Sequence, residues 1–244
     1  MSTTNLRTSC GVQISIRQEH ISSDKVIVIS PGFFQSKETK TFRAIEVDLL
    51  KYFDVISMDY RGHGKSGGLY TFSAREVEDL KVVLDHARKN HKMVGVLGFS
   101  YGGTTALIEQ SIYRNIDSLI CVSSPMASDK IEFKWWLPRS LKLGMKGLEW
   151  GAGARIGNPF LKKVKAIDIV DTLSPMPLFF IHGDQDPTVG YRHSEGLFSK
   201  AKEPKRLEVI SKASHAEEIY RQYPDQFIKL VADWFEQTLE KNNE

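Results

Sequence analysis

The sequence predicts an α/β fold with a mainly parallel central sheet, helices on both faces and a helical cap insertion. Short apolar runs of strand length alternate with amphipathic helical patterns along most of the chain. Most of these runs have apolar centres without alternation, which is typical of strands that are covered on both faces. The chain has 244 residues, of which 41% are hydrophobic, so it can bury one sizeable core.

The first elements follow this pattern from the amino terminus. Residues 11–18 alternate apolar and polar side chains, which predicts an edge strand. Apolar centres at residues 25–30 and 54–59 predict two buried strands. Between them, apolar side chains at helical spacing predict a helix over residues 42–50.

The middle of the chain repeats the alternation. Ser73 is followed three residues later by Glu76, the capping-box arrangement, which predicts the start of a helix. A buried strand is expected at residues 93–97, a helix at residues 101–113 and a further strand at residues 116–122.

The carboxyl-terminal part returns to the same pattern. Strands are expected at residues 178–181 and 207–210, with a helical pattern near residues 191–200 between them. Pro224 is a residue type favoured in the first turn of a helix, and a broad apolar stripe follows it. A last helix is therefore expected to begin there.

One stretch, residues 125–173, contains no convincing buried strand. It holds five glycines, three of the four tryptophans and many lysines. A segment of this length is too long for a plain loop between two core strands. We therefore expect an α/β core formed by residues 1–124 and 174–244, with residues 125–173 inserted as a helical cap.

Composition excludes several functional classes. Lys and Arg total 33 against 30 Asp and Glu, a net charge of +3 that does not indicate a nucleic-acid partner. Two cysteines, Cys10 and Cys121, cannot form a disulfide framework or a structural zinc site, and Cys121 is expected to be buried. The chain shows no secretory leader and no apolar run of membrane-spanning length, so we expect a cytoplasmic, soluble protein. The oligomeric state is not indicated.

The pattern Gly98-Phe-Ser100-Tyr-Gly102 carries the first chemical signal. It lies between an expected strand and an expected helix, the context of a nucleophile elbow. Glycines suit this tight turn because larger side chains would collide with neighbouring elements. The helix amino terminus would also stabilise negative charge near the serine. The alternative is a glycine-rich turn whose serine caps the helix.

A serine hydroxyl becomes a good nucleophile only when a base removes its proton. Of the seven histidines, His215 follows the strand expected at residues 207–210 and so projects from the carboxyl edge of the sheet, where catalytic groups gather. A helix-capping role is the alternative. Asp186 is the favoured acid to orient the imidazole because it lies far into its loop, whereas Asp184 is expected to brace the turn.

A tetrahedral intermediate also needs donors for its oxyanion. One is expected to be the backbone N–H of Tyr101, directly after the serine. The other should come from the loop after the strand at residues 25–30, where Gly32 permits close backbone approach. Phe33 is the leading candidate there, with Phe34 second.

Two further motifs complete a family resemblance: Asp59-Tyr-Arg-Gly-His-Gly-Lys-Ser66 and His182-Gly-Asp-Gln-Asp186. With the serine motif and His215, they make the chain resemble the α/β-hydrolases, in particular small serine esterases and lysophospholipase-like members with an inserted cap. The motifs follow the family's order and span nearly the whole chain. The chain departs from the family in having Pro31 where a histidine often precedes the oxyanion glycine, which bears on the second donor.

The resemblance implies the α/β-hydrolase fold and a Ser100, Asp186 and His215 triad. A serine nucleophile argues against the aspartate-dependent haloalkane dehalogenases and the cysteine-dependent dienelactone hydrolases. We therefore expect a serine hydrolase that cleaves carboxylic ester or thioester bonds of a small to medium acyl substrate, with no cofactor and no metal ion. Acyl transfer, perhydrolysis and C–C bond hydrolysis share this triad and stay open, as does a ligand-binding or signalling protein with a slow hydrolase site.

The cap is expected to supply much of the acyl-binding surface, through Trp135, Trp136 and Trp150. Phe34, in the loop after the strand at residues 25–30, is expected to contribute to the same surface. Packing of the tryptophans onto the core is the alternative. Residues 125–173 hold nine Lys and Arg against five Asp and Glu, so the whole positive excess of the chain lies in the cap. Such a cap could attract an anionic acyl substrate or touch an anionic membrane surface transiently, or simply be solvated.

Overall fold

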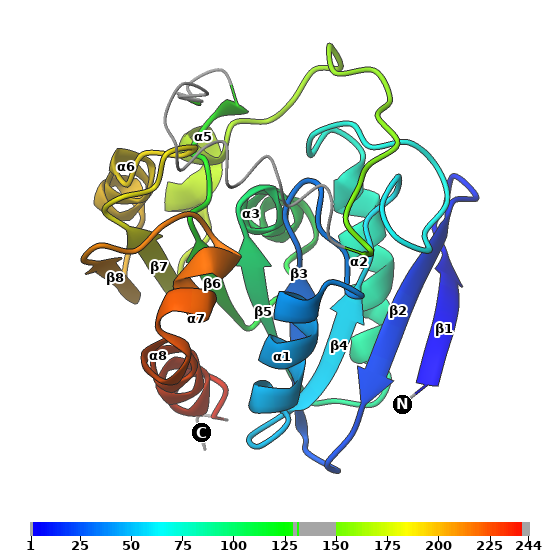
Figure 1. The fold of residues 1–244 in the computed structure, drawn as a ribbon, viewed down its shortest axis with the longest axis horizontal. Coiled ribbons are helices and arrows are strands. Elements are labelled where there is room, and N and C mark those ends of the chain that lie inside the picture. The colour runs from blue at the N-terminus through cyan, green and yellow to red at the C-terminus, as the bar shows by residue number, and fades with distance from the viewer. Residues whose placement is uncertain (1, 129–130, 132–149, 241–244) are drawn as a thin grey trace.

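The computed structural model describes residues 2–128, 131 and 150–240. An eight-stranded sheet crosses the molecule in the order β1-β2-β4-β3-β5-β6-β7-β8 (Figure 1). β2 pairs antiparallel with both β1 and β4, and all other neighbours are parallel, which confirms the mainly parallel sheet. The strands are β1 (Ser2–Arg7), β2 (Gln13–Glu19), β3 (Lys25–Ser30), β4 (Asp54–Met58), β5 (Met93–Phe99), β6 (Ser118–Val122), β7 (Leu178–Gly183) and β8 (Lys205–Ile210).

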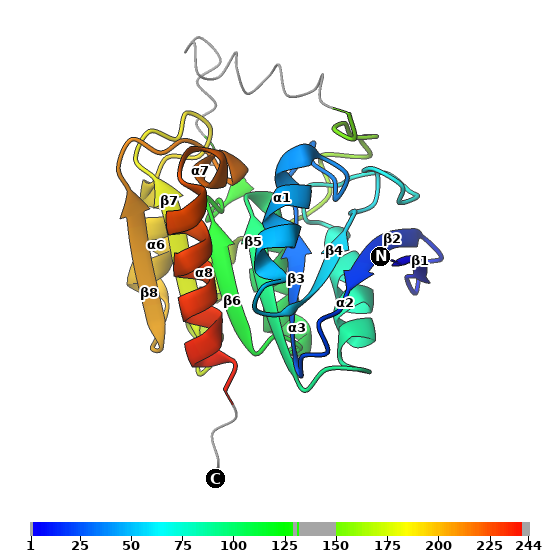
Figure 2. The same ribbon diagram turned by 60° about the horizontal axis from the view of Figure 1, so that its bottom comes forward.

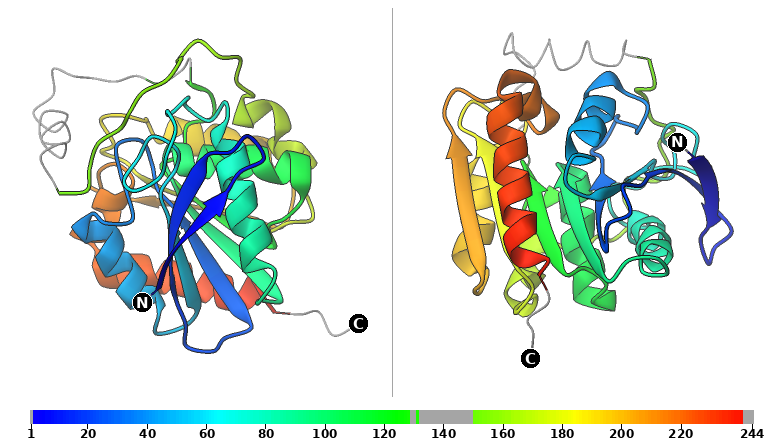
Figure 3. Two further views of the ribbon diagram at one scale, coloured as in Figure 1. Left: turned by 90° about the vertical axis from the view of Figure 1, so that its right-hand side faces the viewer. Right: turned by 90° about the horizontal axis from the view of Figure 1, so that it is seen from below.

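Helices cover both faces of this sheet (Figures 1 and 3). One face carries α1, α7 and α8, and the other carries α2, α3, α5 and α6. The helices are α1 (Lys40–Leu49), α2 (Glu76–Ala87), α3 (Tyr101–Tyr113), α5 (Ala166–Ile169), α6 (Arg192–Lys200), α7 (Glu217–Gln222) and α8 (Pro224–Thr238), with a 3₁₀ turn η3 (Val170–Thr172). In the described part of the chain, no helix is both long and apolar enough to cross a membrane.

Strand β3 shows how the apolar runs build two cores. Val26 and Val28 pack with the helices of one face, whereas Ile27 and Ile29 pack with those of the other. Successive side chains of a strand point to opposite faces, so a strand buried on both sides needs an unbroken apolar run. Cys121 on β6 is buried for the same reason, as expected.

The strand expected at residues 11–18 is present as β2, but its expected edge position is wrong. Strand β1 pairs with β2 along its full length and takes the edge position (Figure 3, left). β1 has the sequence Ser-Thr-Thr-Asn-Leu-Arg, whose single apolar residue leaves no periodic signal. Its place in the sheet depends on backbone hydrogen bonds, which side-chain patterns do not reveal.

The capping box at Ser73 is also wrong. Helix α2 begins at Glu76, and no side chain caps it. The Ser73 hydroxyl instead forms a 2.7 Å hydrogen bond with that of Thr105 on α3. The Glu76 carboxylate accepts hydrogen bonds from the backbone N–H and the hydroxyl of Thr71. A tertiary partner therefore replaces the local cap that the spacing favours.

The described parts of residues 125–173 meet the core at both ends. Ala166 and Val170 are completely buried in the core beside α3 and α6. Upstream, two isolated bridges join His63 to Ala154 and Tyr70 to Ile156, so this stretch lies against the turn that follows β4. Residues 132–149, which include Trp135 and Trp136, lie outside the described residues.

Candidate active site

The carboxyl ends of the parallel strands reach one edge of the sheet, where the loops after β5, β7 and β8 come together (Figure 2). This edge is where open α/β sheets hold their ligands. The three residues expected to form a triad lie in these loops. The site is therefore assembled by parallel pairing rather than by neighbourhood in the sequence.

Ser100 occupies a strained turn between β5 and α3. Its φ and ψ are 50° and −122°, a combination that non-glycine residues rarely adopt. The Ser100 N–H donates to the Val122 carbonyl over 2.8 Å, and its own carbonyl accepts from the Gly103 N–H. The turn thus holds the serine at the amino terminus of a helix of 13 residues, where the helix dipole favours negative charge.

Two glycines make this turn possible by close packing. A Cβ atom on Gly102 would lie 2.2 Å from the Ser30 carbonyl oxygen, and one on Gly98 would lie 2.5 Å from the Gly103 Cα. Both distances are far below contact distance. The G-x-S-x-G glycines therefore let the turn approach the end of β3.

Asp186 and His215 are in direct contact. Asp186 Oδ2 lies 2.6 Å from His215 Nδ1, and its Oδ1 accepts the backbone N–H groups of Thr188 and Val189 over 2.8 and 2.9 Å. Because a carboxylate can only accept, the proton between the pair belongs to His215 Nδ1. The nitrogen left to take up a proton is therefore Nε2.

The carboxylate of Asp186 is completely buried but is held in its charged form. Burial raises its pKa, but the positive charge of His215 and hydrogen bonds from His182 and His215 lower it more. The net pKa lies well below the ordinary value for an aspartate. Asp186 can thus stabilise an imidazolium that forms on His215.

Asp184, the other carboxylate of the motif, faces a different loop. Its Oδ1 accepts the Lys212 N–H over 2.6 Å, and its Oδ2 accepts the Ser211 hydroxyl over 3.3 Å. Both partners lie in the loop that leads to His215. The Asp184 carboxylate thus braces the loop that carries His215, rather than its own turn as expected.

His182 is a member of the site that the sequence analysis did not assign. Its Nε2 lies 3.2 Å from Asp186 Oδ2 and 2.7 Å from the Val189 carbonyl, and its Nδ1 lies 2.7 Å from the Ser194 hydroxyl. Two acceptors around Nε2 require a proton on that nitrogen. The completely buried His182 therefore holds the same Asp186 oxygen, Oδ2, that contacts His215. Its place before Gly-Asp in the motif was the only available signal.

Ser100 and His215 are held by two consecutive residues of the chain. Ser100 bonds to the backbone of Val122, and the N–H of Ala216, directly after His215, donates to Ser123 Oγ over 3.0 Å. The end of β6 thus bonds to the turn that carries Ser100 and to the loop that carries His215. This arrangement positions the two loops relative to each other.

The loop after β3 lies directly against Ser100. A Cβ atom on Gly32 would lie 3.1 Å from the Cβ of Ser100. The Phe34 N–H is already donated to His63 Nε2 over 3.0 Å, so it is not available to an oxyanion. Among the described residues, none accepts the N–H of Phe33. Phe33 and Tyr101 are therefore the two donors that this geometry favours.

His63 positions this loop. Its Nε2 accepts from Phe34, so its Nδ1 carries the proton and donates to the Arg61 carbonyl over 3.2 Å. Burial, opposed by the Arg61 hydrogen bond, lowers the pKa of His63 to about 4, so the ring stays neutral. His63 was not among the expected site residues, although it lies in the family motif at residues 59–66.

Replacing His63 tests this positioning. We expect His63→Leu to lower kcat/KM about 10- to 100-fold, because the freed Phe34 N–H no longer holds the loop beside Ser100. His63→Gln should lose much less, since its Oε1 can accept the same hydrogen bond. Steady-state kinetics on one ester substrate measure both. Equal losses in the two variants would contradict the positioning role.

The low pKa of His63 also predicts a pH dependence of stability. The unfolded chain has the ordinary value of 6.5 and binds a proton below it, whereas the folded protein does so only near 4. The stability due to neutral His63 is therefore complete above pH 6.5, and about 2 kcal/mol of it is lost by pH 5. Urea unfolding at pH 7 and pH 5 should show a smaller decrease for His63→Gln than for the wild type. Identical decreases would rule out this contribution.

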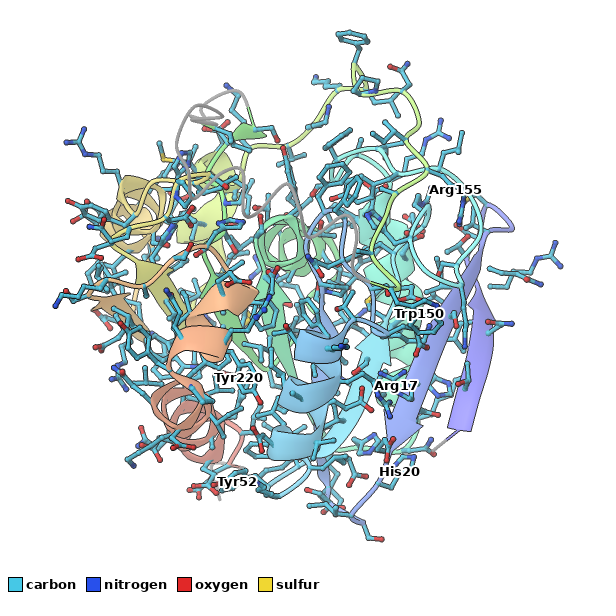
Figure 4. The ribbon with its side chains drawn as sticks, viewed as in Figure 1. Arg17, His20, Tyr52, Trp150, Arg155 and Tyr220 are labelled. Atoms are coloured by element: carbon cyan, nitrogen blue, oxygen red, sulfur yellow. The ribbon has the colours of Figure 1, made fainter. Side chains whose placement is uncertain are left out.

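The candidate cap residues lie differently from one another. The Trp150 side chain is 75% exposed (Figure 4). The residues that follow it contact the loop after β3: the Ser36 hydroxyl donates to the Gly151 carbonyl, and the Gly153 N–H donates to the Phe34 carbonyl. Phe34 is also exposed. The described residues thus place the start of residues 150–157 next to the site, but they do not enclose the Trp150 side chain.

A cluster of aromatic rings, not expected from the sequence, packs at the loop after β3. Phe33 stacks on Tyr70 with ring centroids 5.4 Å apart and contacts Phe72 at 5.2 Å, and Phe72 contacts Tyr101 at 5.8 Å. Phe33, Phe72 and Tyr101 are only partly buried. Their rings offer apolar surface next to the backbone N–H groups of Phe33 and Tyr101, the candidate oxyanion donors.

Comparisons with known proteins decide the family. A family model described as serine aminopeptidase, S33 (Hydrolase_4) matches residues 22–150, more than half of the chain. The chain belongs to this α/β-hydrolase family. The family resemblance drawn from the motifs is thereby confirmed.

Relatives of this family member include the Escherichia coli (strain K12) protein YfhR, 28% identical over 197 residues that make up 78% of this chain. That match spans 63% of YfhR's own length. The human serine hydrolase BPHL is 24% identical over 93% of this chain and 84% of BPHL.

Solved structures confirm the α/β-hydrolase fold. The Pyrococcus furiosus esterase Pf2001 superposes with a TM-score of 0.80 at 25% identity, over 98% of this chain and 91% of the esterase. DcsB, in complex with its substrate analogue, superposes with a TM-score of 0.85 at 15% identity, over 97% of this chain and 99% of DcsB. The family model, the human relative and the esterase support a hydrolase, whereas DcsB shows the fold alone.

Proposed function

We propose that this hydrolase cleaves carboxylic esters or thioesters through a Ser100, His215 and Asp186 triad. The observation that carries the proposal is the 2.6 Å contact between Asp186 Oδ2 and His215 Nδ1, which leaves Nε2 as the base. The strained Ser100 turn at a helix amino terminus supplies the nucleophile. The 25% identity to an esterase of the same fold favours this bond type.

In the first half-reaction, His215 Nε2 takes the Ser100 Oγ proton while Oγ bonds to the acyl carbon. The carbonyl oxygen becomes an oxyanion, which the N–H groups of Phe33 and Tyr101 bind. The bond to the leaving oxygen or sulfur then breaks, and His215 returns its proton to that atom.

In the second half-reaction, a water molecule gives a proton to His215 and bonds to the acyl carbon of the acyl-enzyme. The new oxyanion is held by the same two donors. The bond to Ser100 Oγ breaks, the oxygen regains its proton from His215, and the acid leaves. Asp186 keeps the imidazole oriented and stays ionised throughout.

A substrate panel tests the bond type. We expect turnover of p-nitrophenyl esters between acetate and palmitate, with an optimum at small to medium acyl chains. The reason is that, among the described residues, the apolar surface beside the candidate oxyanion donors is the partly exposed aromatic cluster of Phe33, Phe72 and Tyr101. Acyl-coenzyme A tests thioesters, and an aminoacyl p-nitroanilide tests the peptidase description of the family model. Faster turnover of the anilide than of every ester would contradict esterase specificity.

Covalent labelling tests the base independently of substrate choice. A fluorophosphonate should label the wild type on Ser100, and His215→Gln should slow labelling strongly because the serine is no longer deprotonated. His86→Gln, a substitution on α2 at a distance from the carboxyl edge, serves as the matched control. Labelling at the wild-type rate in His215→Gln would overturn the assignment of the base.

A further inference from the structure

A cluster of potential metal ligands lies at the amino ends of the parallel strands, at the opposite end of the strands from the candidate active site. His20 follows β2, Asp54 is the first residue of β4, and His91 lies between α2 and β5. These positions lie at the amino ends of the parallel strands. His20 accordingly lies at the lower edge of the molecule, well below Trp150 and Arg155 (Figure 4).

Three side chains of this cluster converge on one carboxylate oxygen. Asp54 Oδ2 lies 2.8 Å from His20 Nδ1 and 3.0 Å from His91 Nε2. The ligand atoms of the three residues all lie within 4.8 Å of one another. The two imidazole rings are nearly parallel, with centroids 5.9 Å apart.

The hydrogen bonds of His91 leave one position to be filled. Its Nδ1 lies 3.0 Å from the Ala87 carbonyl, and its Nε2 lies 3.0 Å from the Asp54 carboxylate. Both neighbours are acceptors, whereas a neutral imidazole has only one N–H. Either a second proton or a metal ion must therefore lie between Nε2 and Asp54.

The surroundings of the cluster favour the metal ion. Ligating histidines usually donate their other ring N–H to a carbonyl or carboxylate, as His91 does to Ala87. Ligating carboxylates are likewise held by other hydrogen bonds, and Asp54 Oδ1 accepts the N–H groups of Ile21 and Ser23 over 2.8 and 3.1 Å. The Asp54 oxygen is thus shared by two imidazole nitrogens, a set of two nitrogens and one oxygen that a single ion can contact.

Burial and charge also suit a bound cation. Asp54 and His91 are buried, while the His20 side chain is 48% exposed and gives access from solvent. Lys92 is paired with Asp24 rather than with Asp54.

The geometry points to a site for a divalent transition-metal ion, Zn²⁺ above all, on His20 Nδ1, Asp54 Oδ2 and His91 Nε2. Imidazole nitrogen and carboxylate oxygen are ligands that Zn²⁺ prefers, at about 2.0–2.2 Å, and water would take the fourth position. The ion would join three segments that are far apart in the sequence. This site is independent of the proposed ester hydrolysis.

Metal titration of the full chain tests the site. We expect metal-free protein to bind one Zn²⁺ with a Kd of about 1 μM or tighter by calorimetry. Co²⁺ should give the visible absorption of a four-coordinate ion. At a hundredfold excess over Kd, the unfolding midpoint should rise by about 5–10 °C.

Matched variants separate this site from the catalytic histidine. His91→Gln and His20→Gln should each weaken binding at least tenfold, whereas His86→Gln and His215→Gln should bind as the wild type does. Binding that survives in His91→Gln but is lost in His215→Gln would place the ion in the active site and overturn the proposal. An unfolding midpoint that responds to pH but not to Zn²⁺ would show a second proton instead, and would overturn it too.

Discussion

The Ser100→Ala variant is expected to lose about 10⁴- to 10⁶-fold of kcat on the best ester substrate. Alanine removes the only atom that can form the acyl-enzyme, while Phe33 and Tyr101 N–H groups still bind the carbonyl oxygen. KM should therefore change much less than kcat. Residual turnover would come from water attack at the oxyanion donors. Active-site titration of the wild type and steady-state kinetics of both proteins measure the loss.

The folded state of Ser100→Ala should be intact, so the loss can be assigned to chemistry. Alanine keeps the Cβ atom at φ 50° and the backbone bond to Val122, and circular dichroism should show an unchanged unfolding midpoint. Ser111→Ala, at the other end of α3, is the matched control and should keep wild-type kcat. A Ser100→Ala enzyme within tenfold of the wild type would exclude Ser100 as the nucleophile.

Asp186→Asn is expected to lower kcat about 10³- to 10⁴-fold. Two backbone N–H groups donate to Asp186 Oδ1, so the asparagine oxygen is expected to take the place of Oδ1. Its NH₂ group then faces His215 Nδ1. That nitrogen must become an acceptor, which moves the ring proton to Nε2, and Nε2 can no longer take the proton of Ser100. Kinetics at neutral pH with a p-nitrophenyl ester measure the effect.

Asp184→Asn is the matched control for this prediction. Asp184 accepts the Lys212 N–H and the Ser211 hydroxyl, and an asparagine oxygen can retain one of these bonds. Its kcat should therefore stay within about tenfold of the wild type, because no tautomer changes. If Asp184→Asn were as damaging as Asp186→Asn, the acid would have to be reassigned between the two carboxylates.

The local features of the site could be predicted because they depend on neighbours in the sequence. A strand that ends in Gly-x-Ser-x-Gly before a helix leaves Ser100 only one compact turn, and the glycines reveal it. The last helix begins at Pro224 as predicted, since proline is tolerated where a helix N–H has no partner anyway. The two-faced apolar run of β3 likewise predicted a strand covered on both sides.

The features that could not be predicted depend on contacts between distant segments. His63 accepts a hydrogen bond from Phe34 only because the turn after β4 packs on the loop after β3. No sequence pattern joins His20, Asp54 and His91, which come together only in the folded chain.

The sequence by itself determined the α/β class, the order of the core elements and the motifs from which the site is built, because hydrophobic periodicity and turn chemistry act over a few residues. The tertiary structure decided which carboxylate meets His215, which N–H groups near Ser100 remain available, and that β1 covers β2. Those outcomes depend on hydrogen bonds across strands and loops. Such bonds form only when strand pairing brings separate segments of the chain together, antiparallel for β1 and β2 and parallel for the strands that carry the site.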